Sequence, residues 1–387
     1  MPGFGSWDAY IAAMSSGQTY RAEWNKNFNP TTAALANEYH LMTRGAGNPP
    51  ADALFNTGTN LTWQPVYDNT TSAAALQHGG NVFPYYKYIA NGSAMSASTT
   101  TMPATAILVD MLGFYRVTSV TTITAQNLTN SISSVTNAIT SVDAGADTVT
   151  HTFYALLTGT RVQLTTTTTL PAGLSLATDY YVIKVTDTTC KFATSYANAT
   201  AGTAINITDA GTGTHTINTV LPRYTNGDGV DAIMWNTNST AMGAATPTLA
   251  LPSYTNSAQA TGRATPTVLP VGKTAASNTL VLYSGTGAGK YGPYVPRQSG
   301  DAGIAKIDQV QIGSSYLSGE FSIALVKPLI RIPMTTIGLA GEREFFTQTS
   351  GGAKRVYDGA ALYWLLFSGV ATPTNSGFFG HLDFVWN

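Results

Sequence analysis

The sequence predicts an all-β protein: a jelly-roll-like or sandwich core domain, a second β domain inserted into it, and a short N-terminal helix. Only 10% of the 387 residues are charged, against about 25% in an average soluble chain. Thr, Ser, Asn, Ala and Gly take their place, and of these Thr favours strands while Gly and Asn favour turns. Regular short apolar runs between Gly, Pro and Asn turns also indicate a sandwich or barrel.

The charge balance bears on the class of partner. The formal net charge is −1, which argues against nucleic-acid binding, because that requires clustered Lys and Arg. A nearly neutral surface gives little repulsion between molecules. It suits a subunit that packs against copies of itself or against another protein. The alternative is a soluble enzyme with an unusually neutral polar surface.

The ends and the single cysteine indicate where such a protein assembles. Cys190 is the only cysteine, so no intrachain disulfide forms. The N-terminal stretch has no basic region followed by an apolar run, and no apolar stretch has the length of a membrane span. We therefore expect assembly in the cytoplasm of a cell, with no membrane partner.

The first 30 residues contain the clearest helix pattern. Ser6 can cap a helix that Gly17 ends. The apolar residues recur at the spacing of one helix face: Trp7, Tyr10, Ile11 and Met14. The helix either packs on its own domain or belongs to an N-terminal arm that docks on a neighbouring subunit.

Residues 1–122 are expected to form the first part of the core domain. Leu61–Tyr67 alternates like a strand, and Pro65 suits the edge of a sheet. Ala106–Val109 is the first strongly buried strand, followed by Gly113–Val117.

Residues 123–219 are expected to form the inserted β domain, with the clearest pattern from Asp143 to Thr219. In the stretch 179–185, alternate residues face opposite sides, as in a half-buried strand. Turn residues bound its strands at 171–173, 187–189 and 209–211. The flanking elements 106–120 and 230–236 are predicted to be neighbours in one domain, which the insert interrupts at a tolerant turn.

Residues 220–387 are expected to complete the core domain. A turn is predicted at Asn226–Gly229 and another at Tyr254–Ser257. The dense charge cluster Glu342–Glu344 is assigned to a short helix. The expected strands are 230–236, 248–251, 263–268, 279–283, 304–312, 320–332 with a break at Lys327-Pro328, 360–367 and 377–386.

A glycine-rich run resembles nucleotide-binding motifs but fails their requirements. Gly285–Lys290 has Tyr291 where a phosphate loop needs Ser or Thr. The overlapping fingerprint Gly287–Gly292 is followed by Pro293 rather than by the helix that would hold a pyrophosphate. We expect a flexible loop and no cofactor.

No arrangement of residues predicts catalysis or metal binding, and no catalytic, cofactor-binding or metal-ligating residue is assigned. The five histidines lack ligand spacing, and Cys190 lies in a predicted strand with no apparent base. A two-carboxylate glycosidase site assembled from distant loops stays open as an alternative. The carboxylates considered are Asp301, Asp308 and Glu320, and the histidines are His40, His78, His151, His215 and His381.

Aromatic side chains cluster in predicted loops, where they suit protein interfaces or sugar-binding surfaces as well as ordinary core packing. They are Tyr85, Tyr86, Tyr88, Tyr291, Tyr294, Phe378 and Phe379.

Several strings carry a resemblance to tailed-bacteriophage virion structural proteins. In the insert, LPAGLSLATDYYVIKV, KFATSYANATAGTAI and DAGTGTHT look like an immunoglobulin-like β module that recurs in such proteins. The flanks are similar to phage structural proteins, although this similarity is less specific than that of the insert. It rests on LVDMLGFYRV, LPRYTNGDGV, LYSGTGAGKYGPYVP and GFFGHLDFVW. The resemblance implies a virion subunit without catalysis, whose Ig-like module is an exposed decoration or adhesion element.

Within a virion, we expect a head decoration or cement subunit that forms a homo-oligomer, a trimer, and binds the major capsid protein. A tail, baseplate or receptor-binding component is the alternative, with host-surface glycans as partners of the inserted module. A major capsid protein fits less well, since it needs a long charged helix.

Overall fold

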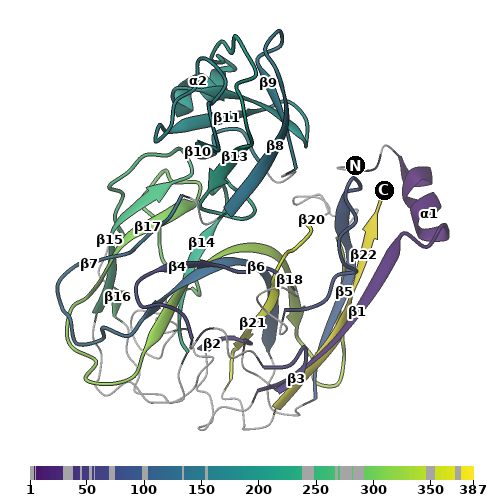
Figure 1. Cartoon of the computed structure of the whole chain (residues 1–387). Helices are drawn as coiled ribbons and strands as arrows, with labels where there is room; N and C mark the ends of the chain where they lie inside the picture. Colours follow the sequence, from purple (N-terminus) through teal and green to yellow (C-terminus); the bar gives the residue numbers. More distant parts are fainter. Residues whose placement is uncertain are drawn as a thin grey trace.

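The computed structural model confirms the all-β fold class, with two helices and twenty-two strands among the described residues. It consists of a large body of three sheets and a smaller barrel at its upper end (Figure 1). The described residues are 4, 6–28, 38–43, 46–51, 55, 57–68, 75–97, 103–132, 135–152, 156–237, 248–265, 269–270, 281, 292–345, 354–370 and 376–387.

The central sheet of the body is built around two fourteen-residue strands, β6 and β18. Nearly every residue of β6 is buried, so both of its faces are covered by other parts of the protein, which explains its almost continuously apolar sequence. The strand order is β14 (Asp231–Asn236), β18 (Phe321–Met334), β6 (Ala104–Val117), β21 (Leu362–Ser368) and β2 (Glu38–Leu41), with β4 (Trp63–Pro65) also on β6.

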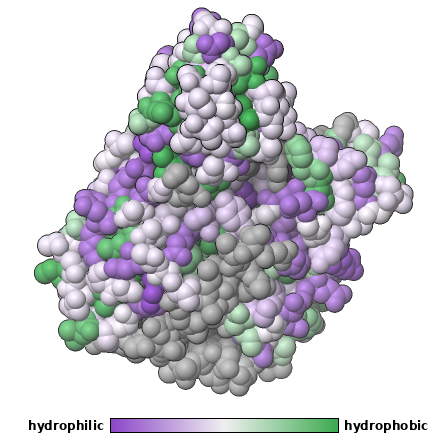
Figure 2. Space-filling model, viewed as in Figure 1, coloured by the Kyte–Doolittle hydropathy of each residue, from purple (hydrophilic) through white to green (hydrophobic). Residues whose placement is uncertain are grey.

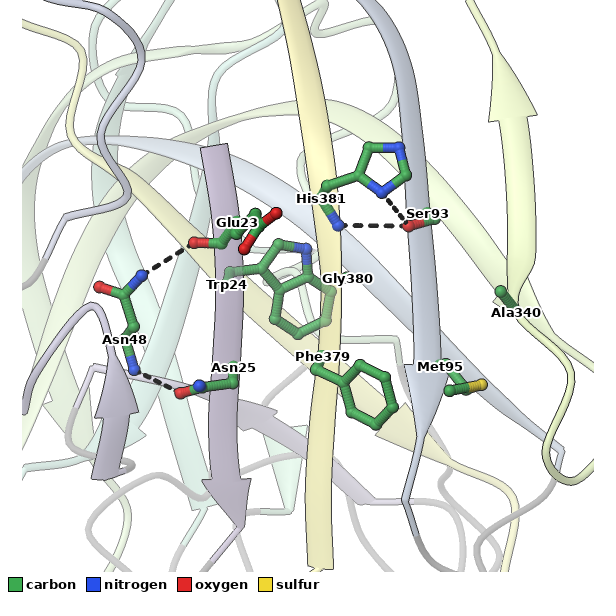
Figure 3. Close-up of a pocket in the computed structure, with 10 residues that line it drawn as sticks. All are labelled: Glu23, Trp24, Asn25, Asn48, Ser93, Met95, Ala340, Phe379, Gly380 and His381. Carbon is green, nitrogen blue, oxygen red and sulfur yellow. Dashed lines mark hydrogen bonds between the residues drawn. The ribbon is translucent and has the colours of Figure 1, made fainter. Parts of the chain in front are cut away.

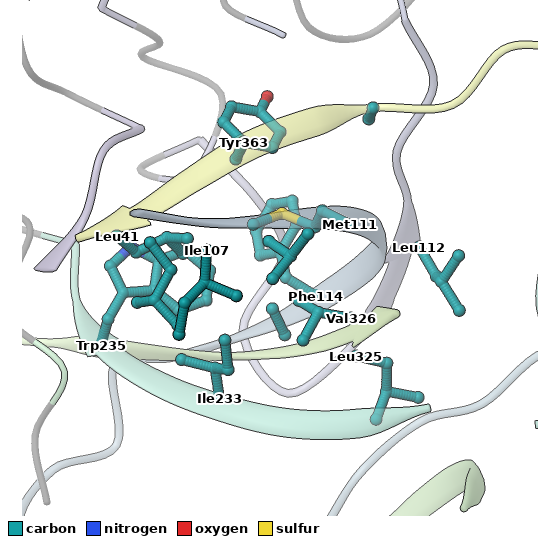
Figure 4. Packing of buried hydrophobic residues seen from close by; sticks show 14 of the residues in the cluster. Leu41, Ile107, Met111, Leu112, Phe114, Ile233, Trp235, Leu325, Val326 and Tyr363 are labelled. Carbon is teal, nitrogen blue, oxygen red and sulfur yellow. The ribbon is translucent and has the colours of Figure 1, made fainter. Parts of the chain in front are cut away.

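Large side chains fill the space beside this central sheet. Phe55 lies against Phe114, Trp235 and Tyr363, with ring centroids 4.9, 5.4 and 6.0 Å away. Figure 4 shows Trp235, Phe114 and Tyr363 with the aliphatic residues around them. Residues far apart in the sequence therefore build one core.

A second sheet, the outer sheet, covers one face of the central sheet. Trp24 stacks on Trp364 of the central sheet with ring centroids 4.5 Å apart, and both side chains are buried. Tyr20 and Trp24 are four residues apart on a strand, so both point inward. The strand order is β19 (Gly341–Glu344), β5 (Lys87–Ser96), β22 (Ser376–Trp386), β1 (Thr19–Phe28) and β3 (Ala46–Asn48), with β20 (Lys354–Val356) also on β5.

A third sheet packs into the same core cluster through Leu249, Ile307 and Val310. The backbone N–H of Ile307 donates to the Tyr115 hydroxyl of the central sheet at 3.4 Å. Asn130 links the same region, because its Nδ2 donates to the carbonyl of Ile307 at 2.7 Å. The strand order is β16 (Leu269–Pro270), β15 (Thr248–Asn256), β17 (Ile304–Ile312) and β7 (Gln126–Asn127).

The inserted domain is a closed six-stranded barrel with a hydrophobic cluster of its own. It closes because two strands each serve two sheets: β10 pairs with β11 through its first residues and with β13 through its last, and β8 bridges β13 and β9 in the same way. Its elements are β8 (Val135–Asp143), β9 (Thr148–His151), β10 (Arg161–Thr166), β11 (Tyr180–Lys184), β12 (Thr189–Ala193), α2 (Tyr196–Ala201) and β13 (His215–Thr219).

Five sequence predictions need correction. The predicted break at Lys327-Pro328 is absent, because β18 continues through both residues. The insert starts at Val135 rather than at 123, because β7 pairs with β17 of the body. The segment 230–236 is not the neighbour of β6, since β18 lies between them. Glu342–Glu344 belongs to strand β19, which pairs with β5, rather than to a helix. The turn at 254–257 is wrong, because β15 continues to Asn256. Most of the predicted strand 279–283 and the loop 285–291 lie outside the described residues.

Candidate interaction surface

The N-terminal helix α1 (Trp7–Ser15) forms as predicted. The Ser6 hydroxyl accepts a hydrogen bond from the backbone N–H of Ala9 at 3.1 Å, which caps the first turn. Asp8 lies in that turn, where its negative charge interacts favourably with the positive end of the helix dipole. Gly17 follows with φ 78°, a left-handed conformation that ends the helix at low cost.

The helix lies on the side of the outer sheet that faces away from the core, beside the C-terminal strand β22 (Figure 1). Its buried residue is Ala13, whose small side chain allows close approach to the strands. Phe4 adds a ring 6.0 Å from that of Tyr88. The small cluster beneath the helix consists of Phe4, Ala13, Tyr88, Ala90 and Val385, with Tyr10 and Tyr86 packed against it.

Most of the apolar stripe predicted from the sequence faces solvent. Trp7, Ile11 and Met14 are 48%, 56% and 43% exposed, and they stand at i, i+4 and i+7 on one side of α1. The helix packs on its own domain through Ala13 and Tyr10, but of the four stripe residues only Tyr10 takes part. We call Trp7, Ile11 and Met14 the α1 outer face.

The predicted aromatic cluster is divided by the structure. Tyr85 is half exposed and Phe83, two residues earlier, is 42% exposed. Tyr88 and Phe378 are core residues, and Tyr294 packs against the main core. Phe379 lies partly buried on the outer sheet, and Tyr291 lies outside the described residues.

The barrel is tied to the body at its β11–β12 hairpin. Asp187 in that hairpin lies 3.5 Å from the Arg355 guanidinium and also accepts a hydrogen bond from Tyr86, which raises the pKa of the Tyr86 hydroxyl. The Arg355 guanidinium itself stacks between Tyr86 and Tyr357, with ring centroids 4.2 and 4.4 Å away. A second contact joins the barrel to the body, because the Thr160 and Thr225 hydroxyls lie 2.6 Å apart.

The chain returning from the barrel is anchored by a buried ion pair. Arg223 donates from Nε and Nη2 to the two carboxylate oxygens of Asp110 in β6, at 2.9 and 2.7 Å. Nη2 also donates to the carbonyls of Val66 and Met111. Asp110 further accepts from the backbone N–H of Ala361 at 3.1 Å. The pair therefore fixes where the insert re-enters the central sheet.

A second buried group of charges has the residue types of a catalytic site. His78 Nδ1 lies 2.8 Å from Lys87 Nζ, and its Nε2 lies 3.3 Å from Asp68. Burial lowers the pKa of Lys87 to about 8 and, with the nearby Lys87, that of His78 to about 3. Both side chains are shut off from solvent, at 0% and 1% exposure, so no substrate reaches them. Asp358 pairs with Lys87 at 3.8 Å. It also accepts hydrogen bonds from the backbone N–H groups of Val82 and Phe83, so the buried charge group anchors the loop before β5.

The remaining candidates from the sequence are also held in structural contacts. Burial raises the pKa of the Cys190 thiol, which disfavours the reactive thiolate. Asp301 pairs with Arg263 at 2.9 Å, Glu320 with Arg116 at 2.6 Å, and Asp308 with Lys306 at 2.7 Å. Within the described ranges, the three carboxylates do not share a site, and no three His, Cys, Asp or Glu residues gather as metal ligands.

Comparison with protein-family models, with curated proteins and with solved structures found no match. Among the described helices, none is both long and apolar enough to span a membrane.

Proposed function

We propose that this chain is a non-enzymatic structural subunit of a tailed-bacteriophage virion, a head decoration or cement protein that binds the capsid shell. The observation that carries the proposal is the α1 outer face. Three large apolar side chains of α1 remain exposed to solvent, although side chains of this type are usually buried in a folded protein. Exposed apolar residues grouped on one face of an element are typical of contact surfaces.

The surface chemistry supports assembly. On the face shown in Figure 2, most described residues are of intermediate hydropathy, with hydrophilic and hydrophobic residues interspersed among them. With a net charge of −1, the energetic cost of packing many copies side by side is small. A homo-oligomer, as expected for a trimeric cement subunit, is part of the proposal.

The inserted barrel supports a role as a fixed projection. It rises from the body (Figure 1) and is held by the Asp187 contacts and the Arg223–Asp110 pair. A rigid attachment presents the same surface from every copy on a particle.

The test is binding to expanded, undecorated heads of the phage that encodes the chain. Co-sedimentation of the wild-type protein with heads, and a higher temperature of head rupture, are the expected results. Ile11→Asp removes a side chain whose burial is worth roughly 1.5–3 kcal/mol, so binding should weaken at least about tenfold. Leu176→Asp, at a side chain on the barrel that is also 56% exposed, is the matched control and should bind normally. Failure of the wild type to bind any head particle would reject the proposal.

A tail or receptor-binding component is the second candidate. Exposed Leu176 and Val185 on the barrel favour it, because apolar side chains at a projection can contact another surface. Immuno-gold labelling of intact virions separates the two: gold over the head supports decoration, and gold at the tail tip supports the second candidate.

A further inference from the structure

The solvent face of the outer sheet is hollowed by two adjoining pockets. The larger, of about 590 Å³, falls within the range of roughly 300–1,000 Å³ typical of small-molecule sites. The smaller, of about 300 Å³, shares His381 with it. We call the two together the sheet groove.

Strand pairing explains why the groove runs across the strands. Glu23, His381, Ser93 and Glu342 are successive partners on β1, β22, β5 and β19. Two residues along the strands, Asn48, Asn25, Phe379 and Met95 are partners on β3, β1, β22 and β5. Alternate residues of a strand share one face, so the two rows lie parallel on the same side of the sheet.

The larger pocket combines an apolar patch with a polar rim. Phe379 and Met95 supply the apolar patch, and Figure 3 shows the Phe379 ring between β22 and β5. Glu23 and Asn25 of β1 and Asn48 of β3 stand at one side of it, and Ser93 and His381 lie two residues further along β5 and β22.

Hydrogen bonds hold these polar groups in place before any ligand arrives. The backbone N–H of Asn48 donates to Oδ1 of Asn25 at 2.7 Å, and Nδ2 of Asn48 donates to the carbonyl of Glu23 at 2.9 Å. Oδ1 of Asn48 and Nδ2 of Asn25 are not engaged by these bonds. His381 Nδ1 lies 2.7 Å from the Ser93 hydroxyl, which fixes the imidazole ring. A preorganised site loses less entropy when it binds.

We infer that the sheet groove binds a neutral oligosaccharide. A sugar ring has an apolar C–H face, which can cover an aromatic ring, and an edge of hydroxyls that both donate and accept hydrogen bonds. The groove offers the matching pair, an aromatic ring and flanking amide, carboxylate and imidazole groups. Two adjoining pockets fit successive sugar units of one chain. An extended peptide would instead need a free strand edge to pair with, and the floor of the larger pocket is the interior of the sheet.

The charges exclude acidic glycans. Glu23 lines the larger pocket, and Glu342 and Glu344 line the smaller one. Arg343 is the cation among the lining residues, and its Nη1 donates to the carbonyl of Arg331 at 3.1 Å. Like charges close together cost free energy, so a sulfated or carboxylated sugar is disfavoured relative to a neutral one.

This inference is independent of particle binding, which is tested separately with heads and α1 variants. The assay is saturation-transfer NMR with the full chain and three probes: cellopentaose and chitopentaose as neutral oligosaccharides, and a heparin pentasaccharide as the anionic one. Saturation transfer to at least one neutral probe and none to heparin is expected. Equal transfer to heparin, or none to either neutral probe, overturns the inference.

Variants locate the site. Phe379→Leu keeps apolar volume but removes the flat ring face, and it should weaken binding of the neutral probe at least tenfold. Glu23→Gln keeps the shape of the rim while removing its charge, and it should admit the heparin probe. Leu176→Ala on the barrel should bind like wild type; if this change rather than Phe379→Leu abolishes binding, glycans bind the barrel and the inference is wrong. Thermal unfolding of each variant confirms that it is folded.

Discussion

Acid should unfold the body of this protein through two buried histidines. Burial lowers the pKa of His40 to about 3, and burial with Lys87 nearby does the same for His78. In the unfolded chain each imidazole titrates near 6.5. As the pH falls below 6.5, the two imidazoles bind protons in the unfolded state but not in the folded state. The stability that depends on the two neutral histidines is therefore fully present above pH 6.5 and is lost progressively between pH 6.5 and 3.

The magnitude follows from the two pKa values. Between pH 7 and pH 5, each histidine should lower the free energy of unfolding by about 2 kcal/mol, and the pair by about 4 kcal/mol. His78 Nε2 also lies 3.2 Å from the Ala360 carbonyl. His78→Gln keeps an amide that can bond Lys87 and this carbonyl, and it should remove about half of this loss. His40→Gln should remove the other half, and the double variant most of it. The absolute stability of the variants at pH 7 is irrelevant, because the prediction concerns the slope with pH.

Tryptophan fluorescence during urea unfolding is the assay at pH 7, 6 and 5. All six tryptophans lie outside residues 135–219, so the signal reports the body and ignores the barrel. If neither single variant reduces the slope, the histidines are not buried neutral in the folded state and the reasoning fails.

Three further predictions concern the attachment of the barrel and the turn beside it. Arg223→Met leaves Asp110 as an unpaired buried charge and should cost about 3–5 kcal/mol in urea unfolding, most of which the double variant with Asp110→Leu recovers; equal losses in both would refute this. Gly227 has φ 81°, and a Cβ added there would lie 2.6 Å from the Ala305 Cα. Gly227→Ala should therefore lower the free energy of unfolding by roughly 1–3 kcal/mol in thermal unfolding, and an unchanged midpoint would contradict the strained turn. Asp187→Ala should change the stability of the body by less than about 1 kcal/mol and increase the motion of the β11–β12 hairpin in NMR relaxation, while the Thr160–Thr225 contact still holds the barrel; unchanged relaxation of the hairpin would show that Asp187 does not hold it.

Local sequence patterns correctly predicted the elements that do not depend on distant parts of the chain. β17 was predicted residue for residue, because Ile304–Ile312 alternates and Gly residues flank it. The helix α1 was found from its cap and its terminating glycine. These signals lie within a few residues of each other, so no knowledge of distant contacts is required.

Features that depend on distant partners were missed. The apolar stripe of α1 indicated a buried face, but the side that packs is the one where Ala13 allows close approach to β22 and β5. The charges of Glu342–Glu344 suggested a helix, while pairing with β5 makes the segment an edge strand whose glutamates face water. The insert boundary was placed too early because only the partner strand β17 reveals that β7 belongs to the body.

The sheet groove left a weak signal in the sequence. Phe379 belongs to the aromatic cluster predicted from the sequence, but Asn25, Asn48 and Ser93 come from strands that only the fold brings together. Alternation in 377–386 could have shown that Phe379 and His381 share a face, yet it could not show which face is solvent-exposed.

The two ends of the barrel are direct strand partners, since Thr219 pairs with Val135. Paired residues of adjacent strands have Cα atoms roughly 4.5–5.5 Å apart. The body therefore meets its insert through a gap that a short turn could bridge. We therefore expect that the body can serve as a display scaffold, in which a domain whose termini lie equally close replaces the barrel, because no strand pair of the three sheets beneath it involves residues 135–219.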